Sequence, residues 1–387
     1  MARPDGMAED CTDEGGQILM SGIWSREQAC DWYNNRPWLR GCNFMSSIDA
    51  NRVEQWQELD FEEHMKVADA ELKLAADTGF NTIRLVMEIA VWDAEHDSYM
   101  KHLEHYLETA WKYGISSMIV FGNDCMPPKD ENWKPVKTGV QTFDWGYHGG
   151  RKYSQHGRFA QMGYHLLDEP EYEHKFYDME AEIIDKYKDD PRVCIWDLYN
   201  EPGNSHRDSV TMPHLKKYYE TAWEIRPSQP LTSGAWRDLT KGYGGLSEVE
   251  KYVLDNSDII SFHNYGDYLT NIKILRFLKT LGRPIICTEW LCRGLHNTVQ
   301  EIYPLFYLEK VGCYNWGFVA GKYQTYEPWE SIWADYAAGG ARDFDFTKWF
   351  HDLYRPSYRP YDPHEIDLIK EVNRLADEDW AEHSQKK

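Results

Sequence analysis

Two glutamates follow apolar runs of the sequence at points where the chain must turn. Glu201 comes directly after the run "WDLYN" and is followed by a proline and a glycine, whereas Glu289 ends the run "PIICTE". Because a buried run is a poor place for a charge, each carboxylate lies either at the edge of a core or in a site built to use it. A pair of such carboxylates is what glycoside hydrolysis requires, one to donate a proton and one to attack.

The elements around these glutamates alternate between two patterns. Short runs rich in β-formers are separated by segments of helical period, such as 61–80, in which Met65, Ala68, Leu72 and Ala75 form one apolar stripe and Gly79 supplies a stop. The predicted strands are 39–44, 81–87, 116–121, 193–198, 230–234, 259–263, 284–289 and 312–318. A strand followed by a helix, eight times over, predicts an α/β protein with a (β/α)₈ TIM barrel.

The whole chain, 1–387, is therefore predicted to be a single catalytic barrel domain. Residues 1–38 form an N-terminal extension packed on the barrel, in which "SREQ" from Ser25 reads as the capping box of a short helix. The connections 122–170 and 320–361, after the third and eighth strands, are far longer than usual and rich in aromatic residues. Because the C-terminal ends of barrel strands carry the active site, we expect both loops to narrow its mouth.

The spacing of the two glutamates fits this barrel. Glu201 follows the fourth strand and Glu289 ends the seventh, and the 88 residues between them correspond to three strand–helix units. Both carboxylates then project over the same mouth. A separation of about 5–5.5 Å between the carboxyl groups is expected if hydrolysis retains the anomeric configuration.

Further polar and aromatic residues end strands on the same side of the barrel. Arg84 would keep one carboxylate ionised through a charge-assisted hydrogen bond. Asn200 offers a donor to a sugar hydroxyl, and His263 and Tyr265 are placed to order the carboxylates. Trp316 offers an apolar face for a sugar ring. Each of these alone is more often structural, but their convergence on one mouth favours a site.

With these residues, the sequence resembles the retaining glycosidases of clan A, and most closely glycoside hydrolase family 5. The resemblance covers 39–318 and rests on "RGCNF", the Arg of "NTIRL", "NEP", "FHNY", "TEW" and "NWG". It implies that Glu201 is the acid/base, Glu289 the nucleophile and Asn200 the partner of the sugar 2-hydroxyl. It also implies a supporting shell of Arg84, His263, Tyr265 and Trp316.

The end of the third strand departs from the family pattern. The family usually places a histidine there, whereas this sequence has Asn123 and Asp124. We expect these two residues to contribute to substrate binding, with different donors around the cleaved sugar.

Composition narrows the class of partner. With 42 basic against 64 acidic residues the net charge is −22, which argues against nucleic acid and anionic membranes and favours a neutral oligosaccharide. The 8 cysteines show no metal-ligand spacing and are expected to be structural, so neither a metal site nor a cofactor is predicted. The sequence shows no secretion signal and no long apolar span, so a cytoplasmic location is expected, while the oligomeric state stays open.

The resemblance also suggests a substrate. Our leading hypothesis is an exo-acting β-mannosidase that cleaves mannosyl-β-1,4-N-acetylglucosamine or manno-oligosaccharides, because two long loops could close the groove into a pocket. The alternative is an endo-β-1,4-glycanase acting on xylan, glucan or mannan, for which an open groove is expected. A barrel that binds carbohydrate without cleaving it is disfavoured, because both carboxylates are present.

Overall fold

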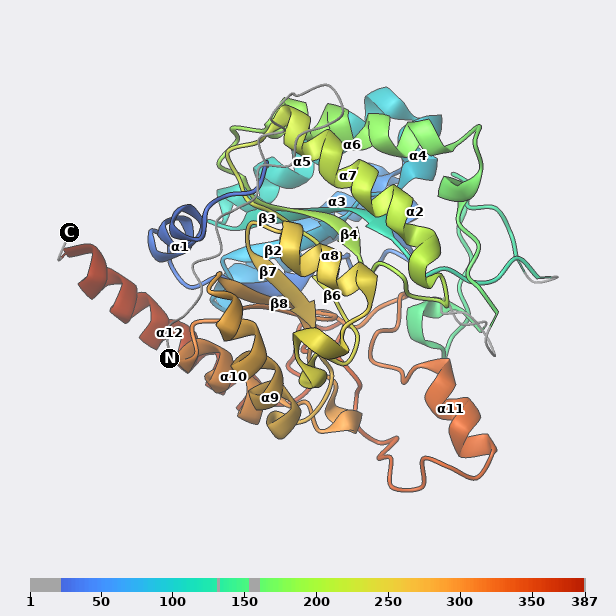
Figure 1. The fold of residues 1–387 in the computed structure, drawn as a ribbon. Coiled ribbons are helices and arrows are strands. Elements are labelled where there is room, and N and C mark those ends of the chain that lie inside the picture. Colours follow the sequence, from blue (N-terminus) through green and yellow to red (C-terminus); the bar gives the residue numbers. More distant parts are fainter. Residues whose placement is uncertain (1–21, 131–132, 153–160, 386–387) are drawn as a thin grey trace, which may run out of the picture.

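A computed structural model describes residues 22–130, 133–152 and 161–385 and confirms the predicted barrel (Figure 1). Its strands begin and end within a few residues of the predicted ones. They are β1 (Arg40–Asn43), β2 (Thr82–Val86), β3 (Ser116–Asn123), β4 (Val193–Asn200), β5 (Leu231–Thr232), β6 (Gly234–Ala235), β7 (Ile260–His263), β8 (Ile285–Trp290) and β9 (Gly312–Asn315).

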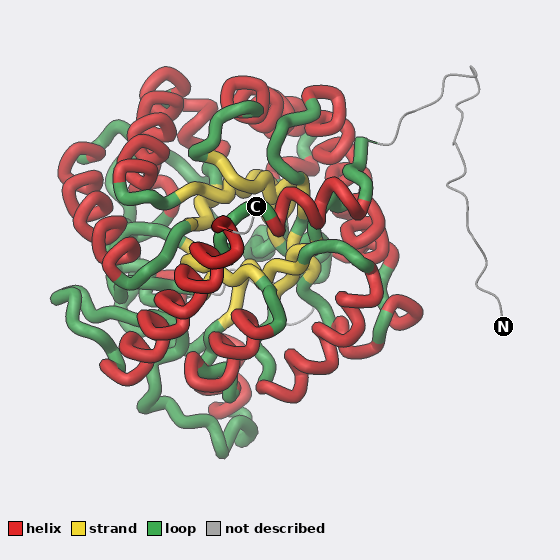
Figure 2. The backbone as a smooth tube through the Cα atoms, turned by 90° about the vertical axis from the view of Figure 1, so that its left-hand side faces the viewer, coloured by secondary structure: helices red, strands yellow, loops and turns green. Residues whose placement is uncertain are grey.

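The strands form one parallel sheet in the order β5-β4-β3-β2-β1-β9-β8-β7-β6. The fifth predicted strand differs from expectation, because it is divided at Ser233 into β5, which pairs with β4, and β6, which pairs with β7. Ser233 therefore joins β5 to β6 through the chain itself, and this link closes the ring of strands. A Cβ atom at Gly234 would lie 2.9 Å from His263 Nε2, so the bare backbone of β6 leaves room for that ring. Figure 2 shows the strands as a ring inside a layer of helices.

The helices surround the ring and cover its outer face. The predicted apolar stripe of α3 is confirmed, since Met65, Ala68, Leu72 and Ala75 are all buried and Gly79 beyond the helix end has a φ of 89°. The helices are α1 (Arg26–Asn34), α2 (Arg52–Trp56), α3 (Phe61–Asp77), α4 (Ile89–Ala94), α5 (His96–Lys112), α6 (Glu173–Tyr187), α7 (Met212–Ile225), α8 (Glu248–Asn256), α9 (Tyr268–Leu278), α10 (Val299–Leu308), α11 (Glu330–Ala337) and α12 (Pro363–Gln385).

Helix α1 packs against the N-terminal ends of the strands. The side chain of Ser25 accepts a hydrogen bond from the Gln28 backbone N at 3.0 Å, and the Trp24 backbone N donates to Asp258 Oδ1 at 2.7 Å. A small apolar cluster lies between this segment and the strands: Trp24, Ala29, Leu39, Met118, Cys194, Ile195, Ile259, Ile286 and Tyr314. This cluster fills the end of the barrel at which the strands begin. Residues 1–21 of the predicted extension lie outside the described residues.

The two long connections lie at the opposite end of the barrel, beside α11 (Figure 1). They are joined by hydrogen bonds around Gln324, whose Oε1 accepts from Gly146 N at 2.6 Å and whose Nε2 donates to Asp144 O at 2.8 Å. His148 Nδ1 lies 2.8 Å from Glu327 O and adds a third link. The connections therefore hold each other in place. Residues 131–132 and 153–160 of the first one lie outside the described residues.

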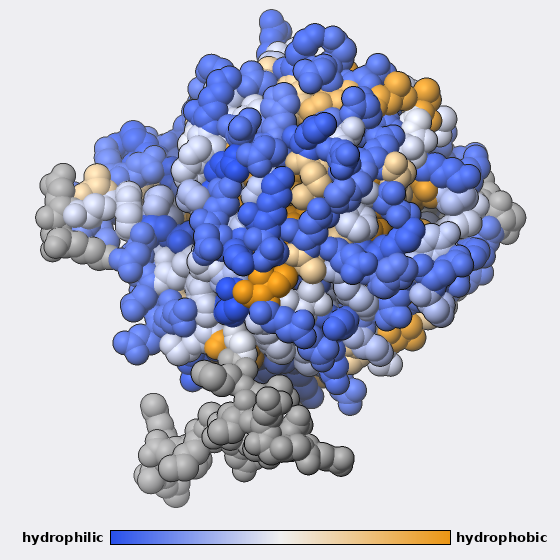
Figure 3. Space-filling view, turned by 90° about the horizontal axis from the view of Figure 1, so that it is seen from above, coloured by the Kyte–Doolittle hydropathy of each residue, from blue (hydrophilic) through white to orange (hydrophobic). Residues whose placement is uncertain are grey.

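The face of the molecule over α5, α6 and α7 is largely hydrophilic, with small separate apolar patches (Figure 3). Among the described residues, no helix is both long and apolar enough to cross a membrane. All seven cysteines in this part of the chain have free thiols, and five of them are buried.

Candidate active site

The backbone delivers Glu201 to the barrel mouth through a strained turn. Glu201 follows the last residue of β4 with a φ of 47°, and Gly203 continues the turn with a φ of 81°. A side chain in this left-handed region costs about 1–2 kcal/mol, so the surrounding fold must enforce it. The buried strand ends here and its next side chain turns into the mouth, which accounts for a carboxylate at the end of an apolar run.

The carboxylates of Glu201 and Glu289 face each other across one imidazole ring. His263 Nδ1 lies 2.7 Å from Glu201 Oε1 and 3.4 Å from Glu289 Oε2. One ligand atom from each of the three residues lies within 4.8 Å of the other two. The two carboxylates are therefore close together, as the spacing of about 5–5.5 Å expected for retaining hydrolysis requires.

Glu289 receives the stronger donors. Arg84 Nη1 donates to its Oε1 at 2.9 Å and the Tyr265 hydroxyl donates to its Oε2 at 2.7 Å. Burial alone would lower the pKa of Arg84, but the carboxylates of Asp197 and Glu289 outweigh it and raise that pKa. Burial, reinforced by the Glu289 charge, raises the pKa of Tyr265. Both groups therefore keep their protons and act as hydrogen-bond donors to Glu289.

Glu201 is surrounded by a different set of groups. Cys125 Sγ donates to its Oε2 at 3.1 Å, and the Asn204 side-chain amide donates to the same oxygen. Burial, with the Glu201 charge as the next cause, raises the pKa of the Cys125 thiol well above its usual range. Cys125 thus differs from the other cysteines of the described residues, because its thiol contacts a candidate catalytic carboxylate.

The structure brings the other predicted residues to the same place, with one exception. Asn123, Asn200, Tyr265 and Trp316 line one cavity together with the two glutamates. Asn200 Nδ2 donates to Asn123 Oδ1 at 2.9 Å, and Arg84 Nη2 donates to Asn200 Oδ1 at 2.6 Å. Arg84 and His263 are buried behind the carboxylates and orient them.

Asp124 is the exception, and the expectation that it binds substrate is wrong. It is fully buried and faces away from the cavity, where it pairs with Arg207 Nε at 2.7 Å. It also accepts hydrogen bonds from the Tyr199 hydroxyl at 2.8 Å and from Gly203 N at 2.6 Å. Asp124 thus braces the turn that carries Glu201.

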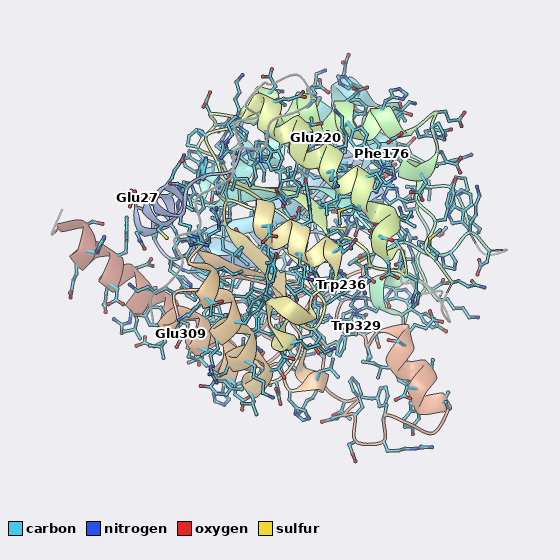
Figure 4. All side chains as sticks on the ribbon, in the orientation of Figure 1. Glu27, Phe176, Glu220, Trp236, Glu309 and Trp329 are labelled. Atoms are coloured by element: carbon cyan, nitrogen blue, oxygen red, sulfur yellow. The ribbon has the colours of Figure 1, made fainter. Side chains whose placement is uncertain are left out.

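The cavity above the carboxylates has a volume of about 770 Å³ and opens to solvent. Both long connections contribute aromatic side chains to its wall: Tyr147, Tyr323, Trp329 and Trp333. Trp329 meets the ring of Tyr265 edge-on, with 5.1 Å between centroids, and Figure 4 shows it at the start of α11. Flat aromatic faces beside polar groups suit the C–H faces and hydroxyl edges of a sugar.

The model of the cellulase family (glycosyl hydrolase family 5) matches residues 48–318. The chain belongs to glycoside hydrolase family 5. It is therefore a retaining glycoside hydrolase whose substrate is an oligosaccharide. Comparison with curated protein sequences gives no match.

Solved structures share the fold of this family 5 enzyme at low sequence identity. A GH5_18 variant from Streptomyces cattleya in complex with Manβ1-4GlcNAc has a TM-score of 0.56 and 11% identity over 88% of this chain and 81% of that one. A β-1,4-mannanase from the sea hare Aplysia kurodai has a TM-score of 0.52 and 15% identity over 73% and 88%. A family 5 mannosidase from Rhizomucor miehei has a TM-score of 0.50 and 14% identity over 87% and 92%.

Sequence reasoning missed several residues of the family 5 site. Asn43 Oδ1 and Asp197 Oδ2 each accept a hydrogen bond from Arg84, at 2.8 Å and 3.1 Å. Both stand in motifs that had been singled out, "RGCNF" and "WDLYNEP", and a polar residue inside a buried strand was the available signal. Cys125 and Arg52 gave no comparable signal, because only the folded chain brings Cys125 to Glu201 and Arg52 to the wall of the same cavity.

Glu201, His263 and Glu289 are also the one group of three in the described part of the chain whose spacing could suit a metal ion. In this enzyme the Arg84 guanidinium already supplies a cation to Glu289. The arrangement suits acid–base and nucleophilic catalysis, with a guanidinium and a phenol beside Glu289 and a thiol, an amide and a histidine beside Glu201.

Proposed function

We propose that this enzyme is an exo-acting β-mannosidase that hydrolyses short β-linked mannosides, such as mannosyl-β-1,4-N-acetylglucosamine or manno-oligosaccharides. The observation that carries the proposal is the carboxylate pair in a cavity that two mutually bonded connections line. The names of the similar solved structures, which include mannosidases, a mannanase and a complex with Manβ1-4GlcNAc, favour mannose as the sugar.

In the first step, Glu201 acts as the acid and Glu289 as the nucleophile. A Glu289 oxygen attacks the anomeric carbon while Glu201 gives its proton to the departing glycosidic oxygen, which leaves as an alcohol. Asn200, held by Arg84, offers its amide to the 2-hydroxyl of the sugar. The product of this step is a covalent glycosyl ester on Glu289.

In the second step, Glu201 acts as a base. It removes a proton from a water molecule, whose oxygen attacks the anomeric carbon and displaces Glu289. Two inversions give net retention of configuration. The Tyr265 hydroxyl and Arg84 stabilise the Glu289 carboxylate when it is released as an anion.

An endo-β-1,4-glycanase is the second candidate, and one observation favours it. The catalytic cavity adjoins a larger one of about 1100 Å³, and the two share lining residues that include Asn123 and Tyr323. Such continuity would suit several sugar units in a row. A non-catalytic binding role is disfavoured because Glu289 keeps a cationic donor that binding alone does not need.

Product analysis separates these candidates. The enzyme should be incubated with aryl β-glycosides of mannose, glucose and xylose and with manno-oligosaccharides of increasing length. Release of single mannose units from the non-reducing end is the expected result. Internal fragments would establish the endo-acting alternative, and the absence of sugar release from every β-linked substrate would revive the hypothesis of a non-catalytic binding barrel.

Substitution of each glutamate is expected to affect hydrolysis in a different way. Glu289→Ala should lose activity on every substrate, because no glycosyl-enzyme forms. The Glu201→Ala variant should still form the glycosyl ester on Glu289 when the leaving group is good, as in a dinitrophenyl glycoside. This covalent intermediate should accumulate, because the base of the second step is missing.

Azide is the discriminating reagent for these roles. It should restore turnover of Glu201→Ala and give a β-glycosyl azide of retained configuration, detected by NMR. Rescue of Glu289→Ala is expected to give an α-azide. An α-azide from Glu201→Ala would mean that the two roles are exchanged.

A further inference from the structure

Two arginines line the catalytic cavity and form no ion pair with the part of the chain that the structure describes. Arg52 is the first residue of α2 and Arg151 lies in the connection after β3, and both are half-buried. Within the described residues, neither guanidinium makes a hydrogen bond or an ion pair. Buried arginines elsewhere behave differently, since Arg84 pairs with Asp197 and Glu289 and Arg293 pairs with Glu365. In a chain of net charge −22, carboxylates to pair with are abundant.

The two arginines stand where two cavities meet. The catalytic cavity and the larger cavity of about 1100 Å³ share Arg52, Arg151 and Tyr323 among their lining residues. Tyr323 and Arg52 also line a third cavity of about 560 Å³ beside Trp316. A sugar bound at the carboxylates therefore presents any substituent that reaches toward the larger cavity to two guanidiniums and a phenol.

Among the described residues, no carboxylate forms an ion pair with Arg52 or Arg151, although Glu88, Glu201, Glu289 and Glu330 line the two cavities with them. Glu88 is the carboxylate of the larger cavity, and it accepts a hydrogen bond from Ala90 N at 3.2 Å rather than pairing with an arginine. Burial raises the pKa of Glu88, although the charges of Arg52 and Arg151 oppose this, so its proton is held more firmly than usual. Glu289 has its own cation in Arg84. Lys134 adds a further positive charge to the larger cavity.

We propose that Arg52 and Arg151 form a binding site for an anionic group, a phosphate or a carboxylate, carried by the substrate sugar. The proposal rests on the glycosidase function proposed above and specifies its substrate class. A guanidinium presents a planar fork of donors that matches both oxyanions. A neutral sugar would leave both forks to water, whereas an anionic one gains two charge-assisted contacts in a partly desolvated wall. These residues determine specificity and take no part in bond cleavage.

Competition by simple sugars tests the site in the intact enzyme. Mannose, mannose 6-phosphate and mannuronate are compared as competitive inhibitors of aryl β-glycoside hydrolysis and as ligands in calorimetry. The anionic sugars are expected to bind at least about 10-fold more tightly than mannose, which corresponds to about 1.4 kcal/mol. Their advantage should shrink as the salt concentration rises, while mannose binding stays constant. The better of the two anionic sugars identifies the oxyanion.

Variants locate the effect. Arg52→Gln and Arg151→Gln should each lower the affinity for the anionic sugars toward that for mannose and leave mannose binding unchanged. Arg276→Gln, which removes an exposed arginine of α9, serves as the control and should change nothing. Circular dichroism checks that each variant is folded. If one variant misfolds, the other variant and the salt dependence still show whether the arginines bind the anionic group.

The outcomes separate this inference from the proposed function. Equal affinity for mannose and its anionic forms, or a preference that survives both substitutions, overturns the anion site even if neutral mannosides are hydrolysed. Tight binding of anionic sugars that is lost in the variants, without hydrolysis of any β-mannoside, supports the anion site and overturns the proposed mannosidase function.

Discussion

The two catalytic candidates differ in the donors that each receives, and this difference predicts their roles. Glu289 accepts from a guanidinium and a phenol, two donors that can stabilise negative charge on a departing carboxylate. Glu201 accepts from a thiol and an amide and lies against His263. The contacts of Glu289 thus suit the nucleophile, and those of Glu201 suit the acid/base.

Tyr265→Phe is expected to weaken the nucleophile without disturbing the barrel. Loss of the hydroxyl removes one of the two donors that favour the ionised carboxylate, so kcat should fall about 10- to 100-fold. Steady-state kinetics measure this fall. Tyr268→Phe, at an exposed tyrosine, is the control. An unchanged kcat would contradict the role given to Tyr265.

Cys125 should report on the acid/base through its reactivity. Burial and the Glu201 charge raise the pKa of this thiol, so iodoacetamide should alkylate it slowly at pH 7 and faster as the pH rises. Alkylation places a bulky group beside Glu201 and should abolish activity, and a competitive inhibitor should protect. Inactivation rates with and without mannose measure this.

Cys125→Ser provides the matched comparison, because it keeps a donor but removes the reactive sulfur. It should remain active and resist the reagent. Rapid inactivation of Cys125→Ser would show that another group is responsible.

At the scale of elements, the strands were predictable and their side-chain partners were not. The predicted strand 193–198 appears as Val193–Asn200, because its apolar run and the following turn both act locally. Asp124 illustrates the limit, since whether a polar residue at a strand end faces the mouth depends on Arg207, 83 residues further along the chain. The contact of Cys125 with Glu201 likewise joins residues 76 apart and had no local signal.

The link between the two long connections should govern access to the site. Gln324→Ala removes the side chain that bonds to Gly146 and Asp144, so the mouth should loosen. KM for a short substrate is expected to rise several-fold with a smaller change in kcat, because substrate positioning is lost before chemistry is affected. Activity on longer oligosaccharides should rise relative to short ones.

Kinetics on mannosides of two to six units measure this effect of Gln324→Ala. Gln300→Ala, on the exposed face of α10, provides the control. If both variants keep the same preference for chain length, the connections do not limit access.

At the scale of the whole molecule, two buried carboxyls make stability depend on pH. Burial raises the pKa of Glu71 to about 7 and that of Asp352 to about 7. Between the ordinary pKa of each group and its folded value, the native state binds more protons than the unfolded state. Stability therefore falls as pH rises through this window and levels off above about pH 7.

Glu71→Gln is expected to remove part of this dependence. The amide of Gln still accepts a hydrogen bond from Ser47 N but carries no charge that must be buried. The free energy of unfolding of the variant, relative to that of the wild type, should therefore rise as the pH increases from 5 to 8. The gain is on the order of 3 kcal/mol at most. Thermal unfolding at several pH values measures it. Glu301→Gln, on the exposed face of α10, should follow the wild type, and a constant difference between Glu71→Gln and wild type would contradict the pKa.

At Glu201, thermal stability and catalysis favour different residues, because the left-handed backbone favours glycine whereas hydrolysis needs the carboxylate. Glycine adopts a φ of 47° without steric cost, so Glu201→Gly relieves the turn while it deletes the proton donor. A laboratory selection for thermal stability alone would accept this substitution, whereas a selection for catalytic turnover would reject it. Engineers who seek a more heat-resistant form of this enzyme must therefore measure activity in every round, because one position where relief of backbone strain would stabilise the fold is a position that hydrolysis cannot lose.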